Sequence, residues 1–293
     1  MVIQPLDSTD NKTLRRLRSL LVNRGLRERQ GVSVLEGVRL IEQARTAGVR
    51  FRTVVYGPRL VATDHGRGLV ARLSPVTEHA LYVTDRVLAE LSDLETSQGI
   101  LAVAPMPTMA RDWPWPDQGP ALFVVMDHVQ DPGNLGMMIR TAQAAGAHAV
   151  GMTEGTVDVF NPKSLRATAG SVFEMPLVEL GADWVQAARQ SQLELLYSVV
   201  DGGDSYETVD WTRPSVLVMG NEGHGVSDIQ GGRRISIAMV PTADSLNVAS
   251  AAAVLLFHAA GVRRRAKLPF MPPRRSMQGG GPGGRNQSKE RYR

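Results

Sequence analysis

The sequence contains no cysteine, and this absence excludes several kinds of protein at once. Disulfide bonds, cysteine-based metal sites and thiol catalysis all require that residue. A chain without cysteine fits a reducing compartment, so we expect a cytoplasmic protein. We expect no metal site.

Long apolar runs are also missing. The longest run, at residues 251–260, consists largely of small side chains, whereas a membrane-spanning helix needs about 20 apolar residues. The basic residues near the N-terminus precede no apolar stretch of the signal-peptide type. We therefore expect neither a membrane span nor a membrane partner.

Phosphate-binding glycine motifs are absent as well. The glycine-rich stretch at residues 219–225 has neither the Gly-x-Gly-x-x-Gly spacing of dinucleotide-binding loops nor the lysine of a P-loop. This argues against a dinucleotide or triphosphate site. The glycines instead allow the backbone to approach a flat ligand such as adenine.

The net charge is small but unevenly distributed. The chain has 33 Lys and Arg against 29 Asp and Glu, a formal charge of +4. Residues 1–52 and 261–293 are strongly basic, whereas the residues between them are acidic. Basic ends on an acidic body are typical of a chain whose ends contact a polyanion. For the C-terminal end, a solubilising tail is the alternative.

Residues 1–104 alternate between predicted helices and strands, which indicates a small α/β domain. Leucines at helical spacing predict one basic helix over residues 12–30. Asp85 is the expected cap of a later helix. The further helices are expected at residues 36–47 and 85–94, and the strands at residues 32–35, 53–56, 81–83 and 100–104.

Residues 105–120 hold five prolines and two tryptophans without periodicity, so we interpret them as the boundary between two domains, either a linker or a strap packed on the surface. The continuous apolar run at residues 121–126 is typical of a strand covered on both faces. A largely parallel, helix-covered sheet is therefore predicted for residues 121–262. Residues 263–293 are expected to form a disordered basic tail that attracts phosphate.

Within residues 121–262, strands and helices again alternate. Asn134 can cap the first of the helices. Strands are expected at residues 121–126, 149–152, 195–200, 216–219 and 235–239, and helices at residues 135–145, 163–168, 183–190 and 248–262.

Three polar loops follow three of these strands. They are residues 132–136 with Arg140 soon after, residues 219–225, and the turn at residues 242–247 before an alanine-rich helix. Open α/β sheets bind ligands at the carboxyl ends of their strands. The three loops are therefore the candidate functional site.

These loops resemble the SpoU (TrmH) branch of the SPOUT methyltransferases. Its first motif is matched by Asn134, Gly136, Arg140, Thr141, Ala142 and Gly146, its second by Gly220, Asn221, Glu222, Gly223 and Gly225, and its third by Ser245, Leu246, Asn247, Val248 and Ala249. Residues 35–41 and 98–102 are similar to the ribosomal-protein-like substrate-binding domain that many members carry. The resemblance covers nearly the whole chain short of the tail.

The resemblance implies a SPOUT-type knotted parallel sheet covered by helices, which works as a homodimer. It implies transfer of a methyl group from S-adenosylmethionine to a ribose 2′-hydroxyl of RNA. The two-domain form is similar to members that modify ribosomal RNA. In this interpretation the catalytic residues are Arg140, Asn134, Glu222, Ser245 and Asn247, the cofactor-binding residues are Gly220, Asn221, Ile237, Met239 and Leu246, and the RNA-binding residues are Arg15, Arg16, Arg39, Lys163 and Arg166.

Each of these residues also has a simpler interpretation. Asn134 and the 242–247 turn can be ordinary helix caps, Arg140 a surface residue and Glu222 a solvated turn carboxylate. His128 and His224 are interpreted as loop residues rather than bases. Many family members have Pro at the position of Ala238 and a small residue at that of Pro241, which leaves the cofactor contacts open.

Three other functions remain open beside ribosomal RNA methylation. The first is a 2′-O-methyltransferase that acts on transfer RNA. The second is an RNA-binding paralogue that has lost activity, against which the retained motif residues count. The third is a small-molecule enzyme, against which the basic ends and the missing phosphate loop count. An arginine side chain almost never deprotonates, so we expect Arg140 to orient and stabilise charge, with the base left open.

Overall fold

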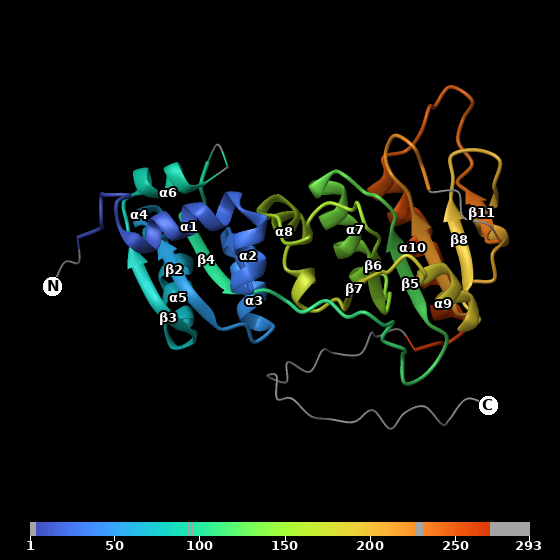
Figure 1. Cartoon of the computed structure of the whole chain (residues 1–293), viewed down its shortest axis with the longest axis horizontal. Helices are drawn as coiled ribbons and strands as arrows, with labels where there is room; N and C mark the ends of the chain where they lie inside the picture. The colour runs from blue at the N-terminus through green and yellow to red at the C-terminus, as the bar shows by residue number, and fades with distance from the viewer. Residues whose placement is uncertain (1–3, 93, 95, 227–230, 270–293) are drawn as a thin grey trace.

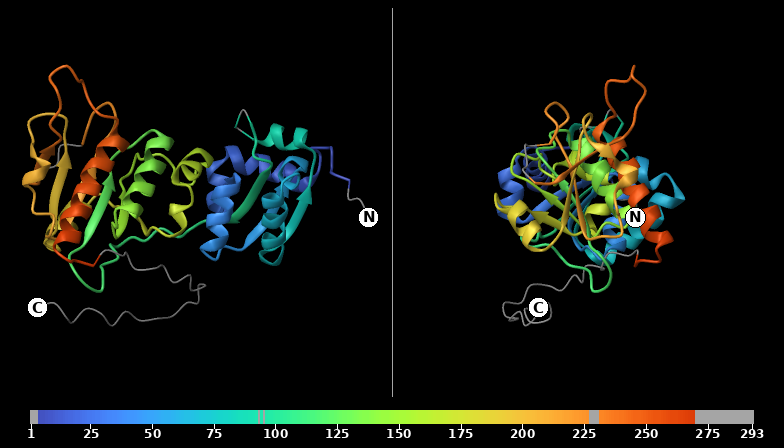
Figure 2. Two further views of the ribbon diagram at one scale, coloured as in Figure 1. Left: turned by 180° about the vertical axis from the view of Figure 1, so that it is seen from behind. Right: turned by 90° about the vertical axis from the view of Figure 1, so that its right-hand side faces the viewer.

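The computed structural model describes residues 4–92, 94, 96–226 and 231–269, and most of the expected basic tail lies outside these residues. The chain is elongated, with two α/β units following one another along its long axis (Figures 1 and 2). The first unit contains a four-stranded sheet and the second a seven-stranded sheet. No helix in the described ranges is long and apolar enough to cross a bilayer.

The first sheet has the strand order β1-β4-β2-β3, in which β4 runs antiparallel to both of its neighbours. β2 and β3 are parallel. Helices pack on this sheet through leucine-rich faces, as for Leu14 and Leu17 of α1. The strands are β1 (Val32–Glu36), β2 (Phe51–Tyr56), β3 (Thr77–Tyr82) and β4 (Ile100–Pro105), and the helices are α1 (Lys12–Val22), α2 (Arg24–Gln30), α3 (Val38–Thr46), α4 (Pro58–Val61), α5 (Asp64–Leu73) and α6 (Asp85–Leu91).

Several boundaries in this unit differ from the sequence prediction. The expected single helix at residues 12–30 is two helices, because Asn23 adopts an extended conformation and its side chain caps α2. The third helix begins at Val38 rather than residue 36, because Gly37 has a φ of 103° that ends β1 first. Thr84, not Asp85, caps α6 through its side chain. Helices α4 and α5 were not predicted.

The segment between the two sheets lies against the second unit. Ala110 forms an isolated parallel bridge with Val178 of β7 (Leu177–Glu179), the outer strand of the second sheet. The Trp113 ring stacks on Phe123 with ring centroids 4.5 Å apart. This segment is therefore packed on the protein along part of its length, although its sequence has no regular pattern.

All paired strands of the second sheet are parallel, as predicted, in the order β7-β6-β5-β10-β8-β11-β9. β5 (Leu122–Met126) is buried on both faces: Val124 faces a core that includes α7, α8 and α10, and Val125 faces a core that includes α9. The remaining strands are β6 (Ala149–Met152), β8 (Glu194–Ser198), β9 (Asp204–Ser205), β10 (Ser215–Met219) and β11 (Arg233–Ser236), and the helices are α7 (Pro132–Ala144), α8 (Pro162–Thr168), α9 (Trp184–Gln190) and α10 (Val248–Arg265). The short helices η1 (Ser74–Val76), η2 (Ser171–Phe173) and η3 (Tyr206–Thr208) complete the chain.

Three features of the second unit correct the sequence prediction. β11 ends at Ser236, so Ile237 and Met239 lie beyond the strand. The cap of α7 is Asp131, whose side chain accepts the Asn134 amide at 2.8 Å, and Asn134 lies within the first turn. α10 continues to Arg265, so Arg263, expected in the basic tail, belongs to the folded unit.

The Arg263 side chain is buried and joins three parts of the second unit. Its guanidinium donates to the carbonyl oxygens of Pro120 at 2.7 Å, Ala121 at 3.0 Å, Trp211 at 2.8 Å and Arg213 at 2.9 Å. Burial lowers the pKa of Arg263 to about 10, so the group stays charged at neutral pH. Carbonyl dipoles thus solvate a buried cation at the amino ends of the central strands.

His148 lies close to Arg263 and is also buried. Its Nδ1 accepts the backbone N–H of Leu122 at 3.0 Å. Burial and the Arg263 charge lower the pKa of His148 to about 4, so the imidazole is neutral in the folded protein at pH 7.

This shift predicts a loss of stability in mild acid. The unfolded chain protonates His148 near its ordinary pKa of 6.5 and the folded chain only near 4. The stabilisation of the folded protein by neutral His148 is therefore fully present above pH 6.5 and decreases as the pH falls to 4. We expect the contribution of His148 to the free energy of unfolding to reach about 3 kcal/mol. Denaturant unfolding of His148→Asn, which keeps an acceptor for Leu122, should show a flatter pH dependence than wild type. The exposed His79→Asn is the control, and an equal slope in both variants would contradict the assignment.

Candidate functional site

A cavity of about 700 Å³ opens at the carboxyl ends of β8 and β10. All five residues predicted to bind a cofactor line it: Gly220, Asn221, Ile237, Met239 and Leu246. Glu222, Ser245 and Asn247, from the predicted catalytic set, line it as well. The second and third loops therefore enclose one pocket, where the sheet topology places it.

The first loop is connected to the other two through Asn134. Its Nδ2 donates to Glu222 Oε1 at 3.0 Å, and its Oδ1 accepts from Asn247 Nδ2, also at 3.0 Å. One side-chain amide thus connects Glu222, which is 88 positions later in the chain, with Asn247, which is 113 positions later. The structure brings Asn134, Glu222 and Asn247 together.

Asn247 combines the two roles that its sequence position suggested. Its Oδ1 accepts the backbone amides of Ala249 at 3.0 Å and Ser250 at 3.2 Å, which caps α10. Its Nδ2 is then directed to Asn134. An aspartate could cap the helix equally well but has no N–H to donate, so the contact with Asn134 requires asparagine.

Glu222 is held by several donors. Besides Asn134, the backbone amides of Gln130 at 3.3 Å and Asp131 at 3.4 Å point to its carboxylate. Partial burial would raise the pKa of Glu222, but the hydrogen bond from Asn134 and the backbone amides outweigh it, and the pKa is lowered. The carboxylate is therefore charged at neutral pH and holds the first loop against the second.

Asn221 makes a second connection between the same loops. Its Nδ2 donates to the His128 carbonyl at 2.8 Å, and its Oδ1 accepts the Gly223 amide at 2.8 Å. The loop closes on itself through paired backbone hydrogen bonds between Asn221 and Gly225. Gly225 has a φ of 72°, which favours glycine.

Gly220 is required by close packing of the backbone. A Cβ at this position would overlap the backbone of Gly225 and Val226. A Cβ at Gly136, from the first motif, would likewise overlap Ser164 and Ala167 of α8. Gly136 therefore has a structural role in helix packing, whereas Gly220 shapes the wall of the pocket.

Arg140 lies apart from the pocket of its own chain. It is exposed on α7, it is not among the pocket residues, and it has no hydrogen bond or ion pair with the residues that the structure describes. Six helical residues separate it from Asn134, which corresponds to about 9 Å along α7 and about 120° around it. Three of the five predicted catalytic residues thus line the pocket and a fourth, Asn134, is hydrogen-bonded to two of them, whereas Arg140 lies on another face.

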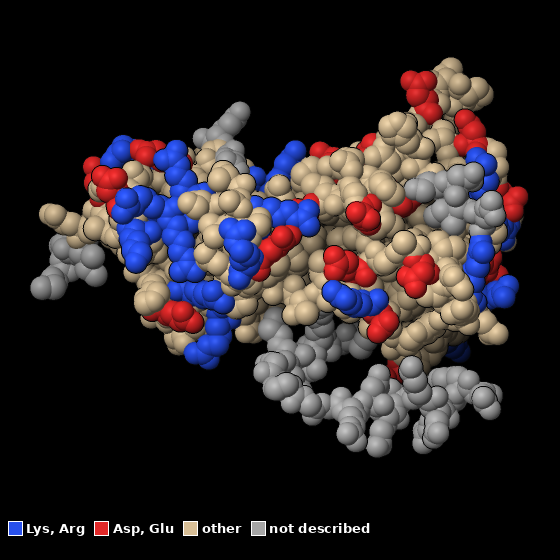
Figure 3. Space-filling model, in the orientation of Figure 1, with Lys and Arg blue, Asp and Glu red and all other residues tan. Residues whose placement is uncertain are grey.

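The predicted RNA-binding residues fall into two groups. Arg15, Arg16 and Arg39 are exposed on the first unit, where Figure 3 shows Lys and Arg side chains gathered over α1 and α2. Lys163 is also exposed, 3.7 Å from Asp131 at the start of α7. Arg166 differs, because it forms an ion pair with the buried Glu36 of β1 at 2.7 Å. Its predicted contact with RNA therefore competes with a structural role.

The residues that line the pocket but were not predicted as site residues include three with polar side chains, Tyr197, Asp201 and Arg234. The first two belong to the carboxyl end of β8 and the loop after it, so the rule that ligands bind at strand ends could have found them. Burial raises the pKa of Tyr197 to about 12, and its hydroxyl has no hydrogen-bond partner among the described residues. No group of acidic or histidine side chains in the described ranges could hold a metal ion.

Two family profiles match the chain, one for each unit. Residues 121–257 match the SpoU rRNA Methylase family, and residues 11–102 match the MRM3-like substrate binding domain. Among curated proteins, the 23S rRNA (uridine(2479)-2′-O)-methyltransferase of Streptomyces viridochromogenes is 33% identical over 266 residues, which cover 87% of this chain and 91% of that protein. The 23S rRNA (guanosine(2553)-2′-O)-methyltransferase RlmP of Bacillus subtilis is 30% identical, with coverage of 80% and 91%.

Solved structures of similar proteins share both units. The SpoU methyltransferase AviRb from Streptomyces viridochromogenes, in complex with AdoMet, superposes with a TM-score of 0.76 at 32% identity and covers 87% of this chain and 98% of its own. An AdoMet-bound rRNA methyltransferase from Sinorhizobium meliloti gives a TM-score of 0.75 at 28% identity, with coverage of 89% and 98%.

The crowding at Gly220 predicts a difference between two neighbouring glycines. Gly220→Ala should lower the free energy of unfolding by about 1–3 kcal/mol, because the new methyl group collides with backbone atoms. Gly223→Ala is the matched control, since its Cβ would meet only Asn221 Oδ1 at 3.5 Å, and should cost less than about 0.5 kcal/mol. Denaturant titration measures both, and equal values would show that the loop rearranges freely.

Proposed function

This chain belongs to the SpoU rRNA methylase family, and from that premise we propose that it transfers a methyl group from S-adenosylmethionine to a ribose 2′-hydroxyl of RNA. Ribosomal RNA is the favoured substrate, because relatives with both units include 23S rRNA methyltransferases. The observation that carries the proposal is the Glu222–Asn134–Asn247 contact, which joins three distant motifs at one pocket. Transfer RNA remains the alternative substrate.

The pocket fits S-adenosylmethionine on its own geometry. Gly220 lets the second loop fold back on itself beside the pocket, because a Cβ there would overlap the backbone of Gly225 and Val226. Ile237, Met239 and Leu246 offer apolar surface to an adenine ring, and backbone groups beside them can bind its nitrogens. When bound, the cofactor supplies an electrophilic methyl group on a sulfonium. Ser245 and Asn247 lie at the same pocket, where a ribose must arrive for in-line transfer.

A ribose hydroxyl is a weak acid, so its proton must be accepted or the developing alkoxide stabilised. Glu222 is poorly suited as the base, because its oxygens already accept from Asn134, Gln130 and Asp131 and its pKa is lowered. A guanidinium such as that of Arg140 can orient the ribose phosphate and stabilise negative charge.

We propose that Arg140 reaches the pocket of a partner subunit in a homodimer. The face of α7 that carries it also exposes Met137, which is 51% accessible. The adjacent helix α10 exposes Val254 at 38% and Phe257 at 48%. Large apolar side chains on two packed helices favour contact with a second copy of the chain. Such contact would bring Arg140 of the partner subunit to the pocket, which its own chain's Arg140 does not line.

Three further features belong to the proposal. The exposed Arg15, Arg16 and Arg39, with Lys163, bind RNA phosphates. The second unit contains the trefoil knot of the family, supported by the crowded backbone at Gly220 and by the run of small residues at 249–253. The similarity to bacterial 23S rRNA methyltransferases supports a protein that works in the cytoplasm.

Methyl transfer from labelled S-adenosylmethionine to total ribosomal or transfer RNA tests the proposal. Arg140→Ala should lower the transfer rate by about 100-fold or more, since charge stabilisation is lost, while cofactor affinity measured by calorimetry stays unchanged. Arg213→Ala, an exposed arginine at the amino end of β10, is the control. Cofactor binding without transfer to either RNA by the wild-type protein would favour an inactive RNA-binding paralogue.

Mixed dimers test the placement of Arg140. Arg140→Ala and Asn247→Ala should each be inactive alone. If each site takes Arg140 from one subunit and Asn247 from the other, half of the randomly reassociated dimers hold one intact site, which restores about a quarter of wild-type activity. Sites built within one chain would stay inactive in every mixture. Sedimentation of Phe257→Asp should show a shift to monomer, which checks that the exposed apolar face forms the contact.

A further inference from the structure

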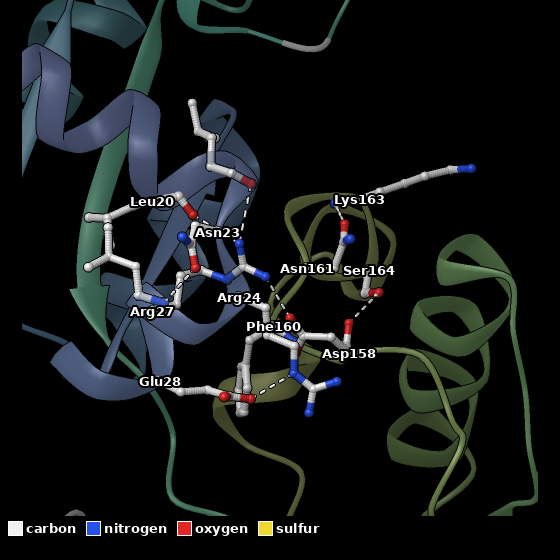
Figure 4. A network of polar contacts seen from close by, with 12 residues as sticks. Leu20, Asn23, Arg24, Arg27, Glu28, Asp158, Phe160, Asn161, Lys163 and Ser164 are labelled. Carbon is white, nitrogen blue, oxygen red and sulfur yellow. Dashed lines mark hydrogen bonds and ion pairs between the residues drawn. The ribbon is translucent and has the colours of Figure 1, made fainter.

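Two ion pairs with largely buried side chains cross the boundary between the two units. Arg27 of α2 contacts Asp158 at 2.6 Å, with side chains 4% and 14% exposed. Glu36 of β1 contacts Arg166 of α8 at 2.7 Å, with side chains 1% and 20% exposed. Figure 4 shows the first pair between α2 and the turn before α8. Each unit thus contributes one arginine and one carboxylate.

The groups from the first unit are fixed by that unit itself. Arg27 Nη1 donates to the carbonyl oxygens of Leu20 at 2.9 Å and Leu21 at 3.2 Å, near the end of α1 (Figure 4). This leaves Nη2 directed at Asp158. The Glu36 carboxylate accepts the hydroxyl of Ser92, which follows α6. These hydrogen bonds hold the side chains of Arg27 and Glu36 in place within the first unit.

On the second unit, Asp158 is part of the turn that starts α8. Its Oδ1 accepts the Phe160 amide at 2.9 Å, and its carbonyl oxygen accepts Ser164 Oγ at 3.0 Å. α8 then packs on α7 so closely that a Cβ at Gly136 would overlap Ser164. α7 carries Asn134 in its first turn, so a short series of rigid contacts leads from Asp158 to the pocket.

The surface around the ion pairs is tightly packed. A Cβ at Gly170 would overlap the side chain of Gln43 in α3, and one apolar cluster includes residues of both units. Removing either carboxylate would leave an arginine without its counter-charge in this packed boundary. A buried unpaired charge is strongly unfavourable, so the boundary would have to open or admit water.

We propose that Asp158 and Glu36 are positioning residues that fix the orientation of the first unit relative to the pocket and thereby select which ribose is methylated. The inference rests on the proposed function. RNA held on the exposed arginines of α1 and α2 reaches the pocket at one distance and angle only if the two units cannot rotate. A loosened boundary would present neighbouring riboses to the same pocket.

The variants Asp158→Asn and Glu36→Gln test this inference with little change of shape. In Asp158→Asn the new amide keeps the oxygen that accepts Phe160 but turns an N–H₂ toward Arg27, and in Glu36→Gln the new amide keeps an acceptor for Ser92. Neither variant removes a cation that could contact RNA. Matched controls are Asp64→Asn and Glu90→Gln, which remove the exposed pairs with Arg67 and Arg86 inside the first unit.

The orientation of the units can be measured without RNA. Because the chain has no cysteine, Ser19→Cys on α1 and Ser191→Cys after α9 place one spin label on each unit. Mixing labelled chains with a large excess of the same variant without these cysteines leaves one labelled pair in each proposed dimer. Pulsed electron resonance should give a narrow distance distribution in wild type and both controls. We expect a broader distribution in Asp158→Asn and Glu36→Gln, and an unchanged narrow one would overturn the inference.

The second measurement is the methylated nucleotide itself, mapped by mass spectrometry on full-length ribosomal RNA. In both variants we expect kcat/KM for RNA to fall about ten-fold, mainly through KM, because only part of the population holds the competent orientation. Methyl groups should also appear on neighbouring riboses, while cofactor affinity stays within about two-fold of wild type. Broadened distances with unchanged kinetics and an unchanged target would overturn the inference. Failure of wild type to methylate RNA would instead contradict the proposed function, and the distance measurement would still decide whether the ion pairs set the orientation.

Discussion

The geometry of the pocket depends on one side-chain amide, that of Asn134. Its N–H donates to Glu222 and its oxygen accepts from Asn247, so one planar group fixes the separation of two loops. A carboxylate in its place could not donate to Glu222, and a hydroxyl could not reach both partners in the same plane. The secondary structure around it ensures that all three residues arrive: Asp131 starts α7, Asn247 starts α10, and Gly220 lets the second loop fold back on itself.

The sequence predicted the parts of the protein that depend on local pattern. Strands such as β5 and β10 and the parallel sheet follow from apolar runs and their spacing. The predicted pocket residues came from the resemblance to the SpoU family, and the position of the pocket agrees with the rule that ligands bind at strand ends. Three of the errors are of one kind, in which several nearby residues could each mark the helix boundary and the sequence does not say which one does. Asn23 breaks a continuous leucine stripe, Thr84 caps in place of Asp85, and Asp131 caps where Asn134 would have been equally suitable.

The arginine residues show most clearly that the sequence does not reveal which contacts a side chain makes. In the sequence Arg27, Arg166 and Arg263 look like the other cations of a basic RNA-binding chain. In the structure Arg27 and Arg166 join the two units, and Arg263 donates to carbonyl groups inside the second. A guanidinium offers five donors in a fixed plane, which suits it equally to phosphate and to buried carbonyl oxygens. Composition therefore predicts the overall attraction for RNA, but not which arginines provide it.

Arg140 differs from Asn134, Glu222 and Asn247 because its side chain makes no hydrogen bond or ion pair with the described residues. A network that fixes Asn134, Glu222 and Asn247 in advance limits the reorganisation needed when a ribose binds, but it also saturates Glu222 and removes it as a proton acceptor. The group that responds to developing charge must then lie outside this network. An exposed arginine on a face that also presents Met137 satisfies that requirement if a second subunit covers the face. The separation of Arg140 from its own pocket is therefore the strongest argument in a single chain for a site shared between two.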